Sequence, residues 1–435
     1  TVDRLLSFTN ANKQRLKMQT GDSVCSDSTA MIMYITLLVL AEPFCSSELL
    51  REEKLKLIAS DYYAGNARLD IENLNMIGDS TADTDPLKSP SSKPVNFISD
   101  CFFMTVHWMK ASLTRQFDDY YEAMRVWGEM QRIDTDSLRA NPILQARLEK
   151  DKAGLQGTMA YLRAFLEHDQ TMFLRSLHFI QLMILFYRHN PDTRLPEFYV
   201  DCIVDFFVFM SRCTPNRWLQ FDESYDCVVD FIVFLLSDHP GNCTNLNIYT
   251  RAKALDVMHG WLVKTENGAM PLVRLFNLTF KDSQSGEIKH LPKVLPSLLF
   301  HIYVDVEKTG SSRQFYEKFN IRFHISTILV MLLTDSSCTM YLSCIMRETG
   351  KEYFIKFQNL LLNDCTYLMD ESLILLQKIH RVDYKIEHNN STTPEQHHQN
   401  ERQLISFMQL SNVNVQLLKL LITHNARVWV REEIV

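Results

Sequence analysis

The sequence has little glycine and little proline. Twelve glycines and 13 prolines among 435 residues amount to about 6% of the chain, roughly half of their share in average proteins. β-Barrels, β-sandwiches and glycine-rich nucleotide loops need glycine at positions of positive φ, so a chain this poor in glycine has few such turns. The deficit favours long helices with few connections and excludes collagenous and low-complexity proteins.

A basic excess and a long apolar run are missing too. The chain has 45 Lys and Arg against 52 Asp and Glu, a net charge of −7, which does not suit a phosphate backbone. Its longest apolar run, residues 31–41, is about half of the ~20 residues that a membrane span needs. We therefore expect no nucleic acid and no membrane among its partners.

The ten cysteines are dispersed along the chain, and several lie within apolar runs, where a thiol acts as a small hydrophobe. This usage is typical of a reducing compartment, and no signal peptide opens the chain. We expect a soluble protein of the cytoplasm and nucleus.

Familiar catalytic motifs are also absent. The sequence contains no phosphate-binding glycine loop, no Gly-x-Ser-x-Gly, no His-Glu-x-x-His and no pair of Cys-x-x-Cys, so it predicts no catalytic residue, no cofactor and no metal. His388, His397 and His398 share a polar stretch, and we interpret them as solvated histidines of a loop rather than as metal ligands.

Apolar residues recur every three or four positions along most of the chain, which is typical of helices. The predicted fold class is all-α. Helices are expected at residues 28–41, 46–62, 96–110, 116–131, 135–166, 170–189, 197–212, 223–238, 248–264, 292–306, 313–334, 352–382 and 400–425. Three polar stretches, near 78–94, 281–292 and 385–400, are predicted to be loops within one array.

One internal repeat is visible. Residues 201–210 and 226–235 are identical at seven of ten positions, at an offset of 25 residues. Each segment is apolar around most of its circumference, so each must be covered by neighbours on several sides. Stacked helices of this kind predict an armadillo- or HEAT-like superhelix.

The repeat also carries acidic residues at helical spacing. If the two helices stack, their carboxylates would form one ridge that attracts a basic partner, although a solvated face explains the same spacing. The candidate ridge consists of Glu197, Asp201, Asp205, Asp222, Asp226 and Asp230.

The stretch 303–324 is dense in charged and aromatic residues around Gly310. Gly310 is expected to close one helix in the left-handed conformation, so that a serine caps the next. Phe315, Phe319 and Phe323 then form a stripe at helical spacing, which we interpret as core in preference to a docking surface.

This stretch, together with residues 295–299, resembles the signature of the core region of ubiquitin conjugation (chain-elongation) factors. These are U-box ubiquitin ligases that extend chains on already ubiquitylated proteins. Further segments resemble the family in the same order: residues 12–15, 40–44, 96–105, 195–200, 359–364, 368–373 and 379–380.

The resemblance implies a right-handed helical-repeat body followed by a C-terminal U-box, which recruits the ubiquitin-conjugating enzyme. The chain starts at Thr1 without a methionine and stops at Val435, before the rest of the core and the U-box. We therefore expect residues 1–435 to be part of the elongation-factor core of a longer enzyme, and to be inactive in ubiquitin transfer alone.

Partners implied by the resemblance are the conjugating enzyme (through the missing U-box), ubiquitylated substrates bound for the proteasome, ubiquitin-like domains of proteasome shuttle factors and the AAA-type segregase ATPase. Two alternatives remain open: an armadillo-type adaptor without ubiquitin chemistry, and an all-helical enzyme with a buried site. The adaptor usually shows regular repeats, whereas here they are mostly degenerate.

Overall fold

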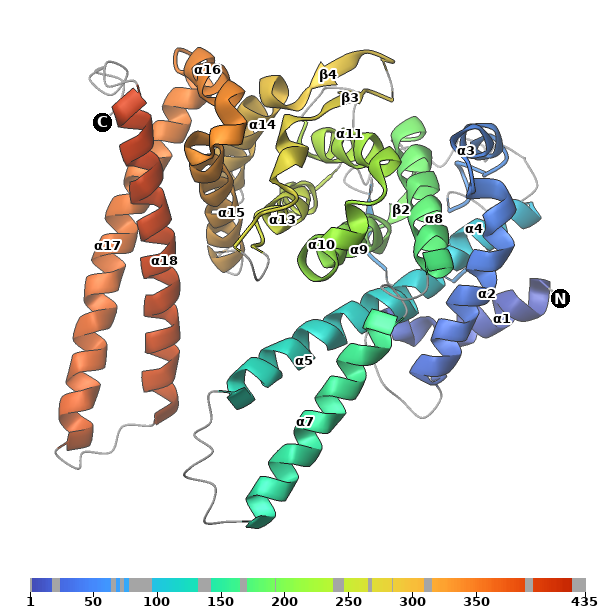
Figure 1. Ribbon diagram of the computed structural model, residues 1–435, viewed down its shortest axis with the longest axis horizontal. Helices are drawn as coiled ribbons and strands as arrows, with labels where there is room; N and C mark the ends of the chain where they lie inside the picture. Colours follow the sequence, from blue (N-terminus) through green and yellow to red (C-terminus); the bar gives the residue numbers. More distant parts are fainter. Residues whose placement is uncertain are drawn as a thin grey trace, which may run out of the picture. The chain divides into compact units, whose positions relative to one another are not determined.

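The computed structural model describes most of the chain, and Figure 1 shows its helices and strands. The described residues are 2–17, 24–63, 68–70, 74–77, 96–131, 142–164, 170–191, 193–237, 246–264, 268–283, 285–308, 315–387 and 394–424. All structural statements below concern these residues.

The described chain is built almost entirely of helices, so the all-α prediction is confirmed. The longer helices are α1 (Val2–Ala11), α2 (Asp27–Cys45), α3 (Glu48–Leu55), α4 (Phe97–Trp108), α5 (Arg115–Gln131), α7 (Pro142–Arg163), α8 (Gln170–His189), α9 (Phe198–Cys213), α11 (Tyr225–Leu236), α14 (Leu291–Asp305), α15 (Phe315–Thr334), α16 (Thr339–Glu348), α17 (Glu352–Glu387) and α18 (Pro394–His424). Three shorter ones are α10 (Pro215–Trp218), α12 (Ile248–Ala252) and α13 (Ala254–Gly260). The armadillo- or HEAT-like, right-handed form of the superhelix stays a prediction.

The chain divides into two compact units, and the division falls within α11. Unit 1 comprises residues Thr1–Phe231, Asp238–Leu246 and Ser283–Gly286, and unit 2 comprises Ile232–Ser237, Asn247–Asp282 and Glu287–Val435. Each unit has its own buried apolar side chains.

In unit 1, helices α2, α4 and α8 pack together. Side-chain caps fix where two of them begin: Ser26 accepts from the Thr29 amide at the start of α2, and Asn96 accepts from the Ser99 amide at the start of α4. Phe102 of α4 lies against Phe179 and Phe186 of α8, with ring centroids 5.6 and 5.3 Å apart. A π-helical turn, Met109–Thr114, joins α4 to α5.

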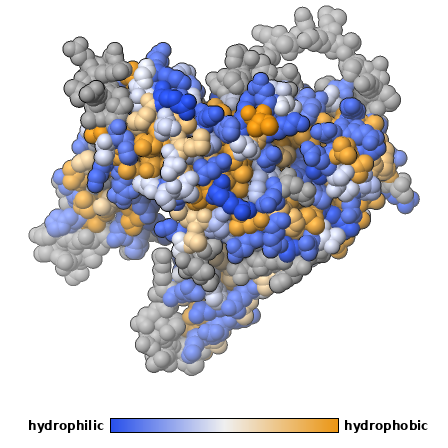
Figure 2. Space-filling model, turned by 45° about the horizontal axis from the view of Figure 1, so that its top comes forward, coloured by the Kyte–Doolittle hydropathy of each residue, from blue (hydrophilic) through white to orange (hydrophobic). Residues whose placement is uncertain are grey.

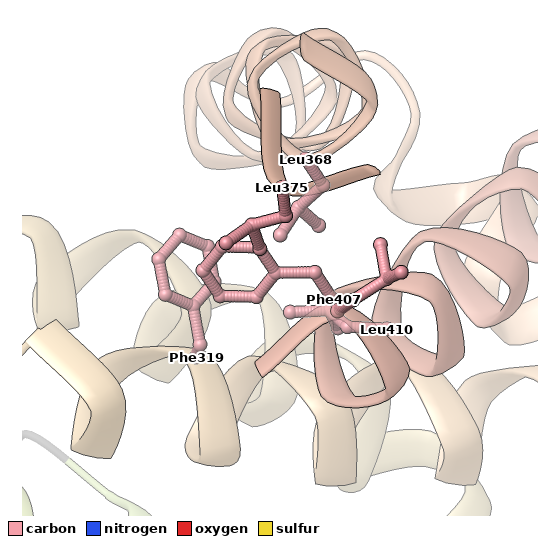
Figure 3. Close-up of a cluster of buried hydrophobic side chains, with 6 residues drawn as sticks. Phe319, Leu368, Leu375, Phe407 and Leu410 are labelled. Atoms are coloured by element: carbon pink, nitrogen blue, oxygen red, sulfur yellow. The ribbon is translucent and has the colours of Figure 1, made fainter. Parts of the chain in front are cut away.

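In unit 2, α17 and α18, the two longest of the described helices, lie side by side and pack on α15 (Figure 1). Figure 3 shows the apolar cluster between them. It consists of Phe319, Leu368, Leu375, Leu404, Phe407 and Leu410, with Phe323 and Ile379 packed against it. Phe319 and Phe323 therefore lie in or against the core, as predicted for these two residues of the aromatic stripe. The side chain of Phe315 and the whole of Gly310 are not described.

Strands are few and short in the described chain. β1 (Met76–Ile77) pairs with β2 (Leu195–Pro196), and β3 (Thr279–Lys281) pairs with β4 (Ile288–His290), both antiparallel. The stretch near 281–292 thus contains a β-hairpin, with Gly286 at φ +70° in its connection. The predicted loop near 78–94 lies outside the described residues. In the one near 385–400, residues 385–387 and 394–400 are helical, so the prediction is wrong there, and residues 388–393 lie outside the described residues.

Two described helices have the length and composition to cross a membrane, Asp27–Cys45 and His398–His424, and the bent pair Glu317–Thr334 with Ser336–Glu348 passes the same criterion. Polar contacts tie the first two into their units: the Tyr34 hydroxyl donates to Ser176, and the Ser326 hydroxyl donates to Asn414. Both helices thus contribute to protein cores. The absence of a membrane partner stays a prediction.

Candidate partner-binding surface

The six carboxylates of the candidate ridge do not share one environment. Asp222 and Asp226 are exposed, while Glu197, Asp201 and Asp205 are partly buried. The sixth, Asp230, is only 2% exposed. The prediction of a six-residue exposed ridge is therefore wrong at Asp230.

Asp230 is instead the centre of a buried polar cluster in unit 1. The Arg188 guanidinium donates to both of its oxygens, over 2.8 and 2.9 Å, and the Ser283 hydroxyl donates to Oδ2 over 2.7 Å. Arg188 is itself 3% exposed. A bidentate pair of this kind joins α8 to α11 with fixed geometry.

We predict that Asp230→Asn lowers the free energy of unfolding by about 2 kcal/mol, because a buried guanidinium then loses a charged acceptor. The matched control is Asp226→Asn, an exposed aspartate of the same helix, which should change it by less than about 0.5 kcal/mol. Chemical denaturation of the two variants measures both values. Equal effects would contradict the structural role assigned to Asp230.

The remaining ridge residues meet other charged groups. The Asp205 carboxylate lies 3.7 Å from the Lys110 ammonium, and the Asn75 amide donates to Glu197. Partial burial, and after it the carboxylate of Glu48 in α3, raise the pKa of Asp226. Asp226 thus lies near Glu48 of α3, a proximity that the sequence did not indicate.

An apolar pocket of about 80 Å³ lies between α2, α3, α4 and α8. Its lining residues are Leu40, Ala41, Phe44, Lys54, Ile58, Phe97, Ile98, Cys101, Phe102, Phe179 and Leu182. Two of the lining residues are about half exposed to solvent: Leu40 is 50% exposed and Phe97 is 56% exposed. The pocket is therefore open to a partner.

A second, polar cleft of about 830 Å³ adjoins the pocket at Ile58, a residue that lines both. It runs along α3 and the following segment to the start of α4 and the end of α8. Two hydrogen bonds fix its wall: the Asn96 side chain donates to the Leu57 carbonyl, and the Ala59 amide donates to the Ser99 hydroxyl, both over 2.8 Å.

The pocket residues were not predicted as a site. A signal was nevertheless present, because the segments 40–44 and 96–105, both singled out in the sequence, supply most of the lining. Other apolar side chains reach the surface elsewhere, in separate patches among hydrophilic ones on the face shown in Figure 2. The exposed apolar residues of unit 2 include Met369 and Leu373 of α17 and Ile405 and Met408 of α18.

The charged stretch 303–324 builds a buried ion cluster in unit 2. Arg322, fully buried, donates to both Asp364 oxygens over 2.7 and 2.9 Å and to Glu307 over 2.6 Å. The Tyr303 hydroxyl donates to Asp364 over 2.7 Å, and Lys318 donates to Glu307. These side chains thus hold α14, α15 and α17 together, which is a structural role.

The surroundings of Asp364 and Glu307 in this cluster shift the pKa values of the two carboxyl groups in opposite directions. Burial raises the pKa of Asp364, although the Arg322 charge opposes it. Burial alone would also raise the pKa of Glu307, but hydrogen bonds and charge from Lys318 and Arg322 outweigh it and hold the pKa below its usual value.

Candidate metal ligands do not gather in the described part of the chain. No three of its His, Cys, Asp or Glu residues are placed to hold a metal ion. Of the three loop histidines, His398 lies 3.1 Å from Glu401 on the surface of α18. The described cysteines form no disulfide, and burial raises the pKa of Cys45 and of Cys202 to about 12.

Comparison with known proteins decides the family. The model of the "Ubiquitin elongating factor core" matches residues 4–435, which is nearly the whole chain. The chain belongs to the ubiquitin elongating factor core family. The predicted resemblance is thereby confirmed.

The chain is similar to several curated proteins, over alignments of different length. The Schizosaccharomyces pombe "Ubiquitin conjugation factor E4" is 26% identical over 485 residues, covering 100% of this chain and 46% of that protein. The Arabidopsis thaliana "Probable ubiquitin conjugation factor E4" is 25% identical, covering 93% and 43%. The Saccharomyces cerevisiae "E4 ubiquitin-protein ligase UFD2" is 32% identical over 144 residues, covering 32% and 14%. The family core described here spans less than half the length of each.

Proposed function

We propose that the chain is the helical scaffold of a ubiquitin ligase that extends ubiquitin chains on already ubiquitylated substrates for proteasomal degradation. The observation that carries the proposal is the family match over residues 4–435. The names of the relatives, ubiquitin conjugation factor and ubiquitin-protein ligase, support it.

In this proposal the transferase activity belongs to the full-length protein, in which a C-terminal U-box recruits the charged conjugating enzyme. A ligase of this kind forms no covalent bond with ubiquitin, so its contribution is to hold the enzyme and the acceptor lysine in reach of each other. Such work needs a rigid body with binding surfaces. The helical units, with their buried ion clusters and apolar cores, suit that task.

The proposed partners are the conjugating enzyme, ubiquitylated substrates, ubiquitin-like domains of shuttle factors and the AAA-type segregase, and the proposed location is the cytoplasm and nucleus. Of the predicted ridge, the exposed carboxylates Asp222 and Asp226 remain candidates for binding a basic domain. Attraction of this kind weakens as salt rises.

A reconstituted reaction tests the proposal. Full-length protein, conjugating enzyme and a mono-ubiquitylated client should yield long chains, whereas residues 1–435 in place of the full protein should yield none. Added in excess to the full protein, residues 1–435 should shorten the chains, because they compete for the client. Gel analysis of chain length measures all three arms.

Two outcomes would contradict the proposal. Robust chain formation by residues 1–435 alone would assign the transferase activity to this region. Failure of the full-length protein to extend the client's chain, with an active conjugating enzyme, would remove the elongation role and favour an adaptor.

A further inference from the structure

The apolar pocket and the polar cleft of unit 1 differ in what they can accept. Small-molecule sites usually enclose about 300–1,000 Å³ and are mostly apolar. The pocket, at about 80 Å³, is too small for such a ligand. The cleft, at about 830 Å³, is lined by charged and apolar side chains in similar measure. The pocket has room for one apolar side chain, while the adjoining cleft has room for the chain that carries it.

The charged residues that line the cleft indicate which charge a partner should carry. Its lining includes the carboxylates of Glu52, Glu53 and Asp61 against one ammonium group, that of Lys56. Glu53 forms an ion pair with Lys54, and Lys54 also lines the apolar pocket.

A further exposed carboxylate, that of Glu48, lies on α3 outside the cleft lining, while the nearby Arg51 is buried. Glu48 and Glu52 are exposed one turn apart on α3, and Glu48 is close enough to Asp226 to influence its ionisation. Like charges one helical turn apart oppose helix formation slightly, and a cationic partner would relieve that repulsion.

This charge argues against a lipid occupant. Cytoplasmic leaflets are anionic and attract basic surfaces. Leu40, Leu49 and Phe97 are exposed apolar side chains, but the carboxylates of α3 beside them would repel anionic headgroups.

We propose that this surface binds a short protein segment that inserts one bulky apolar side chain into the pocket and lays flanking lysine or arginine residues along the acidic cleft. The pocket, bounded by Leu40, Ala41 and Phe97, provides the anchor site. Glu48 and Glu52 provide the electrostatic attraction, which raises the association rate and selects basic partners. Binding at this surface requires no ubiquitin transfer, so it is tested independently of the proposed function.

The test uses the purified protein and a labelled synthetic peptide with one central leucine between lysines, followed by fluorescence anisotropy. The peptide should bind, and replacing its leucine by serine should weaken binding about tenfold, as expected for one buried apolar side chain. A peptide with glutamates in place of the lysines should not bind. Raising the salt to about 0.5 M should weaken the lysine peptide several-fold.

Protein variants locate the site. Leu40→Ser removes an apolar side chain from the rim of the pocket, and Ala41→Trp fills the pocket. Each variant should weaken peptide binding about tenfold. Glu52→Lys should weaken it about fivefold at low salt and much less at about 0.5 M salt. The matched controls are Ile143→Ser, an apolar residue 79% exposed on α7, and Glu317→Lys on α15, neither of which lines the pocket.

Each result either supports or overturns the proposed peptide-binding surface. Loss of binding in the pocket variants but not in the controls supports the proposal, and Leu40→Ser serves alone if Ala41→Trp does not fold. Equal binding of the leucine and serine peptides, or of all variants, overturns it. Binding to phosphatidylserine vesicles that depends on Leu40 would overturn it in favour of a lipid surface.

Discussion

Replacing Arg322 by alanine is expected to lower the free energy of unfolding of unit 2 by about 4 kcal/mol. The substitution leaves two carboxylates, Asp364 and Glu307, without the guanidinium that they share. Breaking a buried pair by removing one partner costs about 3–5 kcal/mol, since a buried charge then remains uncompensated. Tyr303 also loses a cation that lies 4.8 Å from its ring centre.

Hydrogen exchange measured on the amides of α14, α15 and α17 reports this change, with α8 of unit 1 as the internal reference. The control is Lys318→Ala, because Lys318 contacts a Glu307 side chain that is 46% exposed, and such pairs contribute at most about 1 kcal/mol. The double variant Arg322→Met with Asp364→Leu should recover part of the loss, since apolar residues can replace a buried pair. A single variant as stable as the native protein would show that the cluster does not hold these helices together.

Replacing Phe407 by alanine should have an effect of similar size, about 4 kcal/mol, on the attachment of α18. Phe407 is 3% exposed and lies in the cluster of Figure 3, with its ring centroid 6.3 Å from that of Phe319. Phe→Ala changes in a core cost about 3–5 kcal/mol because they lose apolar burial and leave a cavity.

Proteolysis and hydrogen exchange of α18 measure this effect, while α14 should stay protected. The neighbouring Met408→Ala is the control, because Met408 is 54% exposed and its loss should change stability by less than about 0.5 kcal/mol. If Phe407→Ala leaves α18 as protected as Met408→Ala does, the cluster is not what fixes this helix.

Helical periodicity predicted most of the fold, since a repeat of three or four residues requires only local information. It was least accurate where backbone geometry breaks the period. The helix expected at 248–264 is divided at Lys253 into α12 and α13. Helix α16 was not predicted, because a 3₁₀ turn, Ser336–Cys338, follows α15 almost directly and leaves it only ten residues.

The candidate site shows where a single sequence stops being informative. Asp205 and Asp230 occupy equivalent positions of the repeat, yet one is half-exposed beside Lys110 and the other is buried against Arg188. That difference comes from α8, which no local pattern around Asp230 specifies. In the same way, the apolar sequence of α2 does not reveal that Leu40 forms the rim of an open pocket.

The buried cysteines have a chemical consequence for a scaffold of the proposed kind. A thiolate can attack a thioester and take over its acyl group. The cysteines of a scaffold that binds near a ubiquitin thioester could therefore react with it. With a pKa of about 12, the sulfurs of Cys45 and Cys202 are ionised to about one part in 10⁵ at neutral pH, and only the ionised form is nucleophilic. Both thiols are therefore poor nucleophiles, so the proposed scaffold would not divert ubiquitin from a thioester through these two cysteines.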